Sequence, residues 1–124
     1  MKKALVFLLS LALVLAMSSS ALATDYLVFS TGGTTGTYYA FGGEIAALLS
    51  KKVDGLDVTA QSSGGSKANI LAIKEGEAEI AWTQNDVMSY AYQGTEYFGG
   101  KPVECFSAIG SIYPEAVQLV VAKD

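Results

Sequence analysis

The sequence of 124 residues predicts an α/β fold in which a parallel sheet is flanked by helices. Short apolar segments with strand character alternate along the chain with longer segments whose apolar residues recur at helical spacing. A repeated strand–helix order favours parallel strands joined by right-handed crossovers. Three of the segments that lead from a strand into a helix are also rich in Gly, Ser, Thr and amide side chains. Together these observations predict one modest domain with its polar loops at one sheet edge.

The first strand is predicted over residues 26–29, which are apolar without alternation, as in a strand covered on both faces. The first helix is predicted from Tyr38 to Lys52. Its apolar residues are spaced for one face, and Lys51 and Lys52 suit the negative helix end. Gly55 can stop this helix.

The later elements follow the same alternation. A second strand is predicted over residues 56–60, where Leu, Val and Ala alternate with polar residues, and a third strand over residues 80–83. The second helix is expected to have Ser66 as its N-cap and to end at Gly76, and the third to be capped by Asn85 or Asp86 and to end at Gly94. A polar connection, 93–102, then leads to two strand-like runs, 106–113 and 117–122, separated by Pro114.

The N-terminus has the pattern of a secretory signal peptide over residues 1–23. Lys2 and Lys3 precede an apolar run, and Ala21 and Ala23 supply the small residues that signal peptidase requires. The apolar run is shorter than the roughly 20 residues of a spanning helix. No cysteine stands at the cleavage point for lipid attachment. We therefore expect a periplasmic or secreted product that begins at Thr24 and has no membrane insertion after cleavage.

Composition excludes several classes of function. After loss of the signal, six lysines remain against twelve acidic residues, a net charge of −6 that disfavours nucleic acid as a partner. The chain has no histidine, the commonest general base and metal ligand, and we predict no cofactor and no metal. The acidic residues Glu75, Glu77 and Glu79 lack the spacing of a calcium loop and indicate a solvated turn. Cys105 stands in an apolar stretch and is interpreted as a packing residue.

The loop over residues 30–39 is the strongest candidate for a ligand site. Its glycines can adopt backbone angles that other residues cannot, its threonines supply hydroxyls, and the first amides of the next helix suit a carboxylate or phosphate. It lacks the Gly-Lys-Ser/Thr end of a Walker loop and the spacing of the dinucleotide fingerprint. A tight turn without a ligand is the alternative. Similar loops follow the second and third strands, at residues 61–66 and 83–86.

These motifs, taken together, resemble the TAXI family, the extracytoplasmic solute receptors of TRAP-type transporters. The resemblance rests on four linked motifs and covers essentially all of residues 24–124. They are TGGTTGTYY at 31–39 with Gly42 and Gly43, SGGS at 63–66 with Asn69, QNDV at 84–87, and IYPE at 112–115.

The resemblance implies one lobe of a type II periplasmic binding protein that captures a small organic acid or amino acid such as glutamate. It further implies delivery of this ligand to the membrane subunit of a TRAP transporter. The ligand-facing positions that the resemblance implies are Gly33, Thr34, Gly36, Thr37, Tyr38, Ser63, Gly65, Ser66, Gln84, Asn85 and Tyr113. Family members are longer and have a second lobe, so residues 24–124 are expected to be an N-terminal lobe, truncated before the second one.

An alternative is a secreted small-molecule-binding or hydrolytic α/β domain unrelated to transport. Ser66 lacks the Gly-x-Ser-x-Gly elbow and no histidine could activate it, so we do not expect an enzyme. Tyr38 could stack on a ligand or belong to the core, and Trp82 is interpreted as packing. Lys67 could pair with an acidic ligand or simply be solvated.

Overall fold

The computed structural model describes residues 24–116 and 120–122. The predicted signal peptide, residues 1–23, lies outside the described residues, and so do residues 117–119 of the last strand-like run. Residues 120–122 have no regular structure.

Three parallel strands form the sheet, in the order β2-β1-β3. They are β1 (Asp25–Ser30), β2 (Leu56–Gln61) and β3 (Ile80–Ala81). Leu27 of β1 is in register with Val58 of β2, and Phe29 is in register with Ile80 of β3. The predicted α/β fold with a parallel sheet and flanking helices is therefore confirmed.

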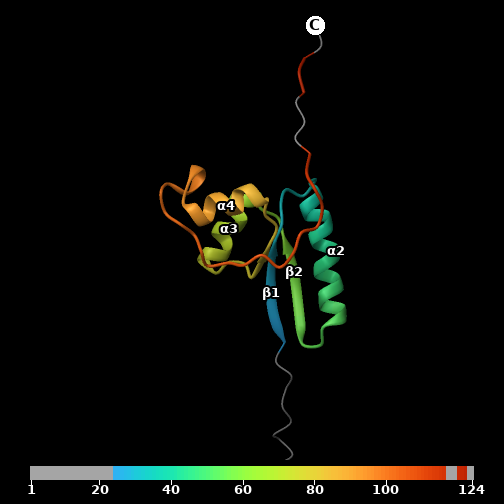
Figure 1. Cartoon of the computed structure of the whole chain (residues 1–124). Coiled ribbons are helices and arrows are strands. Elements are labelled where there is room, and N and C mark those ends of the chain that lie inside the picture. Colours follow the sequence, from blue (N-terminus) through green and yellow to red (C-terminus); the bar gives the residue numbers. More distant parts are fainter. Residues whose placement is uncertain (1–23, 117–119, 123–124) are drawn as a thin grey trace, which may run out of the picture.

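The helices lie on two sides of this sheet (Figure 1). Helix α2 (Thr37–Lys52) follows β1, helix α3 (Ser66–Glu75) follows β2, and helix α4 (Asn85–Gln93) follows β3, with a short 3-10 turn, η1 (Glu96–Phe98), after it. Phe29 packs with the α2 side, whereas the next residue, Ser30, hydrogen-bonds to Asn69 of α3. Successive residues of a strand point to opposite faces, so α2 and α3 cover opposite faces of the sheet.

The predicted ends of α3 and α4 are confirmed, whereas the predicted N-caps are wrong and α2 ends earlier than Gly55, with Val53 as its C-cap. Gly76 and Gly94 end α3 and α4 in the left-handed conformation, at φ 72° and 68°. The N-cap positions belong to Gly65 and Gln84, and no side chain caps either helix. Ser66 is already helical, and its hydroxyl instead accepts a hydrogen bond from the Gln84 backbone N–H at 3.0 Å.

The third strand is shorter than predicted: it ends at Ala81, whereas the prediction extended to residue 83. The backbone N–H of Trp82 still donates to the Ser30 carbonyl at 3.1 Å. Its carbonyl, however, accepts from the Asn69 side chain at 2.6 Å, which directs the chain away from the sheet.

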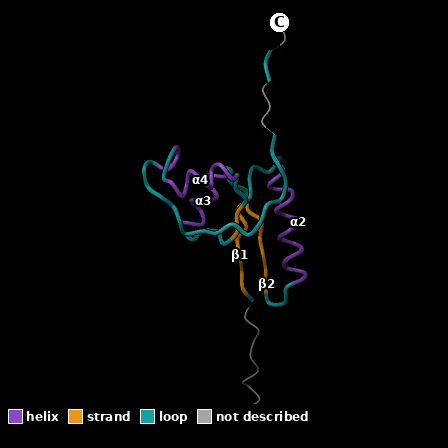
Figure 2. Tube along the Cα trace, viewed as in Figure 1, coloured by secondary structure: helices purple, strands orange, loops and turns teal. Residues whose placement is uncertain are grey.

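The strand predicted over residues 106–113 is also wrong. These residues have no regular secondary structure and belong to a segment, 101–116, that we call the crossing segment. It runs from the α3 and α4 side across the sheet to the beginning of α2 (Figure 2). Apolar residues here have β propensity but no neighbouring strand, and a strand needs a partner for its backbone groups. Cys105 is exposed, so its packing role is not supported either; the adjacent Phe106 takes the inward position.

Two hydrophobic clusters form the core. The sheet cluster is built on Phe29, Ala46 and Val58, with half-buried residues of α2 and of the strands around them. The helix cluster joins α3, α4, η1 and the start of the crossing segment, and its buried members are Ile70, Val87, Ala91, Phe98 and Val103.

Candidate ligand-binding site

The three strand-to-helix loops meet at one edge of the sheet and are joined by hydrogen bonds. The N–H of Ser63, in the second loop, donates to the Gly32 carbonyl of the first at 3.0 Å. The N–H of Gln84, in the third loop, donates to the Ser66 hydroxyl at 3.0 Å. This is the edge at which open parallel sheets bind their ligands.

A buried asparagine fixes the strand ends below these loops. Asn69 is 0% exposed. Its amide N–H groups donate to the carbonyls of Thr31 at 2.7 Å and Trp82 at 2.6 Å, and its oxygen accepts from the Ser30 hydroxyl at 2.8 Å. Asn69 thereby ties the ends of β1 and β3 to α3. The sequence analysis included it in a motif but missed this role; its place beside Ile70, on the inward face of a helix, was the available signal.

Close packing holds the start of α2 against the end of β1. A Cβ atom on Gly42 would lie 2.4 Å from Cγ2 of Thr31, so only glycine fits here without a shift. The indole N–H of Trp82 donates to the Tyr38 carbonyl at 3.0 Å, and the Trp82 ring lies 4.8 Å from the Phe29 ring. The packing interpretation of Trp82 is confirmed.

The glycines of the first loop do not use their special backbone freedom, contrary to the sequence-based expectation. Gly32, Gly33 and Gly36 are all absent from the positive-φ region, and Gly36 has φ −92°. Its N–H donates to the Gly33 carbonyl at 2.8 Å and closes a turn. Gly65 is different: its φ of 88° and ψ of −163° are open essentially only to glycine.

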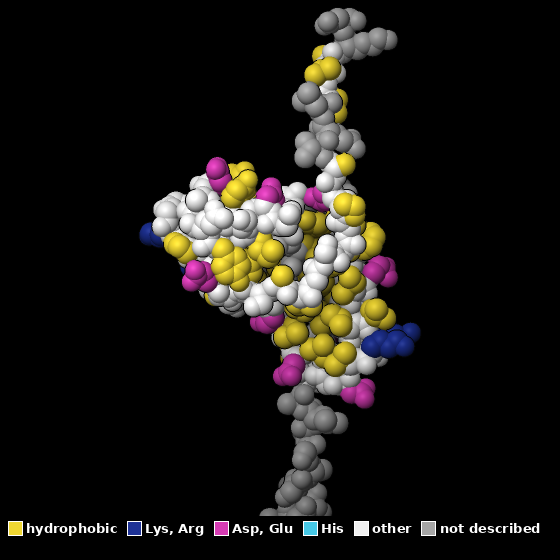
Figure 3. All heavy atoms as spheres, in the orientation of Figure 1, with side chains coloured by type: hydrophobic (Ala, Val, Ile, Leu, Met, Phe, Trp, Pro, Cys, Tyr) yellow, Lys and Arg dark blue, Asp and Glu magenta, His cyan; other side chains and the backbone are white. Residues whose placement is uncertain are grey.

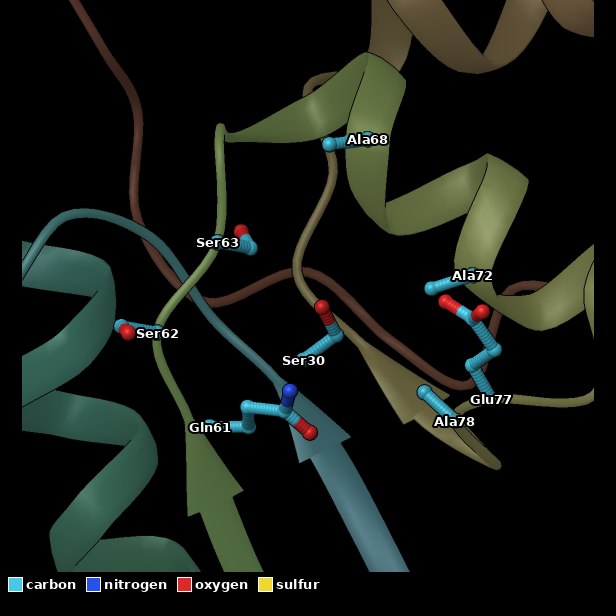
Figure 4. A pocket seen from close by; sticks show the side chains of 8 residues that line it. All are labelled: Ser30, Gln61, Ser62, Ser63, Ala68, Ala72, Glu77 and Ala78. Carbon is cyan, nitrogen blue, oxygen red and sulfur yellow. The ribbon is translucent and has the colours of Figure 1, made fainter.

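The predicted site residues divide between two hollows and an exposed loop. The smaller hollow has a volume of about 170 Å³ and contains Ser63. Figure 4 shows Ser30 and Gln61 entering it from the strand ends, facing Ala68 and Ala72 of α3.

The larger hollow is open and lies between the loops, the sheet face and the crossing segment. Four predicted residues line it, namely Tyr38, Gln84, Asn85 and Tyr113. Figure 3 shows hydrophobic side chains gathered on this face of the molecule. Exposed residues of the first loop line neither hollow; they are Gly33, Thr34, Gly36 and Thr37. Gly65 and Ser66 are half-buried and also line neither hollow.

Glu115 connects the crossing segment to the loops, and sequence reasoning did not select it. One carboxylate oxygen accepts from the Gln84 side-chain amide at 2.6 Å, and the other accepts from the Tyr113 hydroxyl at 3.3 Å. The Tyr113 ring lies 6.3 Å from Tyr38 and 6.1 Å from Phe41. Glu115 stands in the IYPE motif, two residues after Tyr113, which was the available signal.

The two tyrosines of this group have raised phenol pKa values. Partial burial is the main cause at Tyr38, the negative charge of Glu115 adds to it, and interaction with the Ser66 side chain lowers the pKa in part. At Tyr113 the pKa is raised by desolvation first, and then by the charge of Glu115 and the hydrogen bond to it. The Tyr113 hydroxyl donates its proton in the hydrogen bond to Glu115.

Three other residues considered in the sequence analysis, Lys67, Tyr38 and Glu79, contact neighbouring parts of the protein. Lys67 is exposed, and its Nζ atom lies 5.9 Å from the centre of the Tyr97 ring. Tyr38 both packs, 6.1 Å from the Trp82 ring, and lines the larger hollow. The Glu79 carboxylate accepts a hydrogen bond from the Val28 N–H at 2.7 Å. Within the described ranges, no group of three or more Asp, Glu, Cys or His residues is placed to hold a metal.

Comparison with known protein families shows which family this chain belongs to. The NMT1-like family matches residues 29–124, which is most of the chain. It is a periplasmic-binding-protein-like family, generally without enzymatic activity and usually extracytoplasmic. In residues 24–116 and 120–122, none of the helices has both the length and the apolar character needed to cross a membrane. The three-stranded parallel lobe and this match agree: the chain belongs to the NMT1-like family of periplasmic-binding-protein-like solute-binding proteins.

Proposed function

We propose that this chain is a receptor of the TAXI type for a TRAP transporter. It binds a small carboxylate or amino acid, such as glutamate, outside the cytoplasmic membrane and delivers it to the membrane subunit. Residues 1–23 direct its export, and residues 24–124 form the N-terminal lobe of the receptor. The observation that carries the proposal is the meeting of three strand-to-helix loops at one edge of the sheet.

The N-termini of α2 and α3 supply the anion-binding chemistry. Helices α2, α3 and α4 all begin at this edge, and none of the three has a side-chain hydrogen bond at its N-cap. The first turn of α4 contains Asp86, whose carboxylate accepts from the Val87 N–H at 2.7 Å, whereas the first turns of α2 and α3 contain no acidic residue. Amides of the first helical turn have no partner within the helix and carry partial positive charge. A ligand carboxylate is held by such amides together with the side chains of Thr34, Thr37, Ser66 and Gln84. All eight basic residues of the chain are lysines, so no arginine fork takes part.

The open shape of the larger hollow suits a two-lobed receptor. In such a receptor the ligand is buried only when a second lobe closes over it. A single lobe leaves one side of the ligand in water, where polar contacts contribute little. We therefore propose that this edge alone binds in the millimolar range and that the second lobe supplies the remaining affinity.

Nuclear magnetic resonance titration tests the proposal, because it detects weak binding residue by residue. With glutamate and related acids added to the exported chain, we expect amide shifts confined to the three loops and the first turns of α2, α3 and α4. Thr37→Val and Gln84→Ala should each weaken binding by about 1 to 3 kcal/mol, since each removes a partner of a polar ligand group. Thr59→Val, at an exposed position of β2, is the matched control and should bind as the parent does.

The proposal is contradicted if none of the acids shifts the loop amides at millimolar concentration. It also fails if both site variants bind as tightly as the Thr59→Val control.

A further inference from the structure

We infer that Glu115 is a specificity-determining residue that selects a ligand carrying a protonated amine beside its carboxylate. The inference rests on the proposed receptor function and narrows its ligand class. A zwitterion would bind, with its carboxylate at the helix N-termini and its amine at Glu115. A plain organic acid would bind less well.

The position of Glu115 is the first step of the argument. Glu115 lines the larger hollow together with Gln84 and Asn85. Both carboxylate oxygens are oriented by neutral donors, the Gln84 amide at 2.6 Å and the Tyr113 hydroxyl at 3.3 Å. Neutral donors orient the carboxylate but leave its negative charge uncompensated.

The aromatic surroundings of the carboxylate are the second step. The Tyr113 ring lies beside Tyr38 and Phe41, at 6.3 and 6.1 Å between ring centres. Tyr38 and Tyr113 both line the larger hollow, so aromatic surface is available to a ligand beside Glu115. Ring faces attract cations, and a carboxylate next to them can accept a charge-assisted hydrogen bond from an ammonium group.

The distribution of charge is the third step. Asp86 also lines the larger hollow, whereas no lysine does so among the described residues. Lys51 and Lys52 lie in the last turn of α2, at the opposite end from the loops, and Lys67 lies over the Tyr97 ring. The raised pKa values of Tyr38 and Tyr113, to which Glu115 contributes, agree with a negative field in the hollow.

The two halves of the site therefore have opposite preferences. The N-termini of α2 and α3, which have no acidic residue in their first turns, favour an anionic group, while Glu115 and Asp86 repel a second one. A ligand with one carboxylate near the amides and one ammonium near Glu115 satisfies both. The structure thus favours an amino acid over a dicarboxylate of the same length.

The test compares L-glutamate with glutarate, which has the same two carboxylates and lacks the amine. Loop amide shifts are followed for the parent chain, for Glu115→Gln and for Glu104→Gln, an exposed acid of the same crossing segment. We expect glutamate to bind the parent roughly tenfold more tightly than glutarate, the contribution of a charge-assisted hydrogen bond. Glu115→Gln should remove this preference by weakening glutamate binding, and Glu104→Gln should keep it. Circular dichroism should be unchanged, because Glu115 is exposed.

Equal affinity for both acids in the parent chain overturns the inference and leaves the receptor function standing. The inference is also overturned if Glu115→Gln keeps the preference for glutamate. If neither acid changes the amide shifts of the loops, the receptor proposal fails. A titration with butylamine then tests separately whether Glu115 binds an amine. Shifts at Tyr113 and Glu115 that disappear in Glu115→Gln support this binding, and their absence overturns it.

Discussion

Residues 25–93 and the crossing segment, 101–116, are held in place by different kinds of interaction. In the first region β1 is paired with β2 along six residue pairs, and each of the three strands is followed by a helix. The crossing segment is attached mainly by side chains: Phe106 packs beside Tyr92, whose hydroxyl donates to the Phe106 carbonyl, and Tyr113 and Glu115 contact the loops. Its Ile109 is 91% exposed.

The difference shows what an apolar sequence needs in order to become a strand. Both regions contain runs of β-branched and aromatic residues, yet only the first has partner strands for its backbone groups. A segment held by a few side chains can open locally at a lower free-energy cost than one held by a hydrogen-bonded ladder. Glu115 lies on this less firmly held segment, so its carboxylate can change position when a ligand binds.

The largest effect is expected at Asn69, which fixes the first region. Asn69→Ala removes three hydrogen bonds of a completely buried side chain and leaves the carbonyls of Thr31 and Trp82 without this partner. We expect a loss of about 4 kcal/mol in the free energy of unfolding, measured by chemical denaturation. Asn85→Ala, at an exposed position, is the control and should cost under about 1 kcal/mol. Equal costs for both variants would mean that Asn69 does not hold the strand ends.

A somewhat smaller effect is expected at Gly94, where the two regions join. Gly94 has φ 68°, and an added Cβ would lie 2.7 Å from the Pro102 backbone nitrogen and 2.8 Å from the Lys101 carbonyl carbon. Gly76 has a similar φ of 72° but open space around it. Gly76→Ala should cost about 1 kcal/mol through backbone strain alone. Gly94→Ala should cost about 3 kcal/mol, because backbone atoms must also move. The same thermal or chemical unfolding for both variants would show that the turn adapts without cost.

The sequence was most informative where local chemistry decides the structure. Helical spacing predicted all three helices, and the glycines at 76 and 94 correctly predicted two helix ends, since a left-handed residue there favours glycine. The polar loops at one edge followed from the parallel strand order. These features depend on residues close together in the chain.

The features that sequence reasoning missed depend on distant residues. Residues 106–113 can form a strand only if they pair with the edge of a sheet. The length of β3 depends on Asn69, whose side-chain amide donates to the Trp82 carbonyl just after the strand. Ser66 was predicted to cap α3, but its hydroxyl accepts a hydrogen bond from the backbone N–H of Gln84, 18 positions later. The interaction of Glu115 with Gln84 joins residues 31 positions apart. The place of Asn69 beside Ile70 and of Glu115 in the IYPE motif marked these two residues, but no periodic or local signal identifies the partners that they bind.

A third comparison lies within α2, between adjacent glycines. An added Cβ at Gly42 would lie 2.4 Å from Thr31, which is completely buried, whereas nothing lies within 4 Å of such an atom at Gly43. Gly42→Ala should cost about 2 kcal/mol through overpacking. Gly43→Ala should stabilise the protein by about 0.5 kcal/mol, because alanine favours the helix. Thermal unfolding of the pair measures the difference, and stabilisation by both changes would disprove the close contact between α2 and the end of β1.

The smallest effect is expected within the crossing segment itself. Phe106 is half-buried, stacks 4.9 Å from the Tyr92 ring and packs against the helix cluster, so Phe106→Ala should cost about 1.5 kcal/mol, less than at a full core position. Ile109→Ala, at a side chain that is almost wholly in water, should change stability by less than about 0.5 kcal/mol. Hydrogen exchange of amides 106–113 gives a second measurement. If these amides are protected like those of β1, or if Ile109→Ala is the more costly change, the segment forms a strand in solution. The crossing segment would then be held by backbone hydrogen bonds, as residues 25–93 are, and the two regions would no longer differ in this respect.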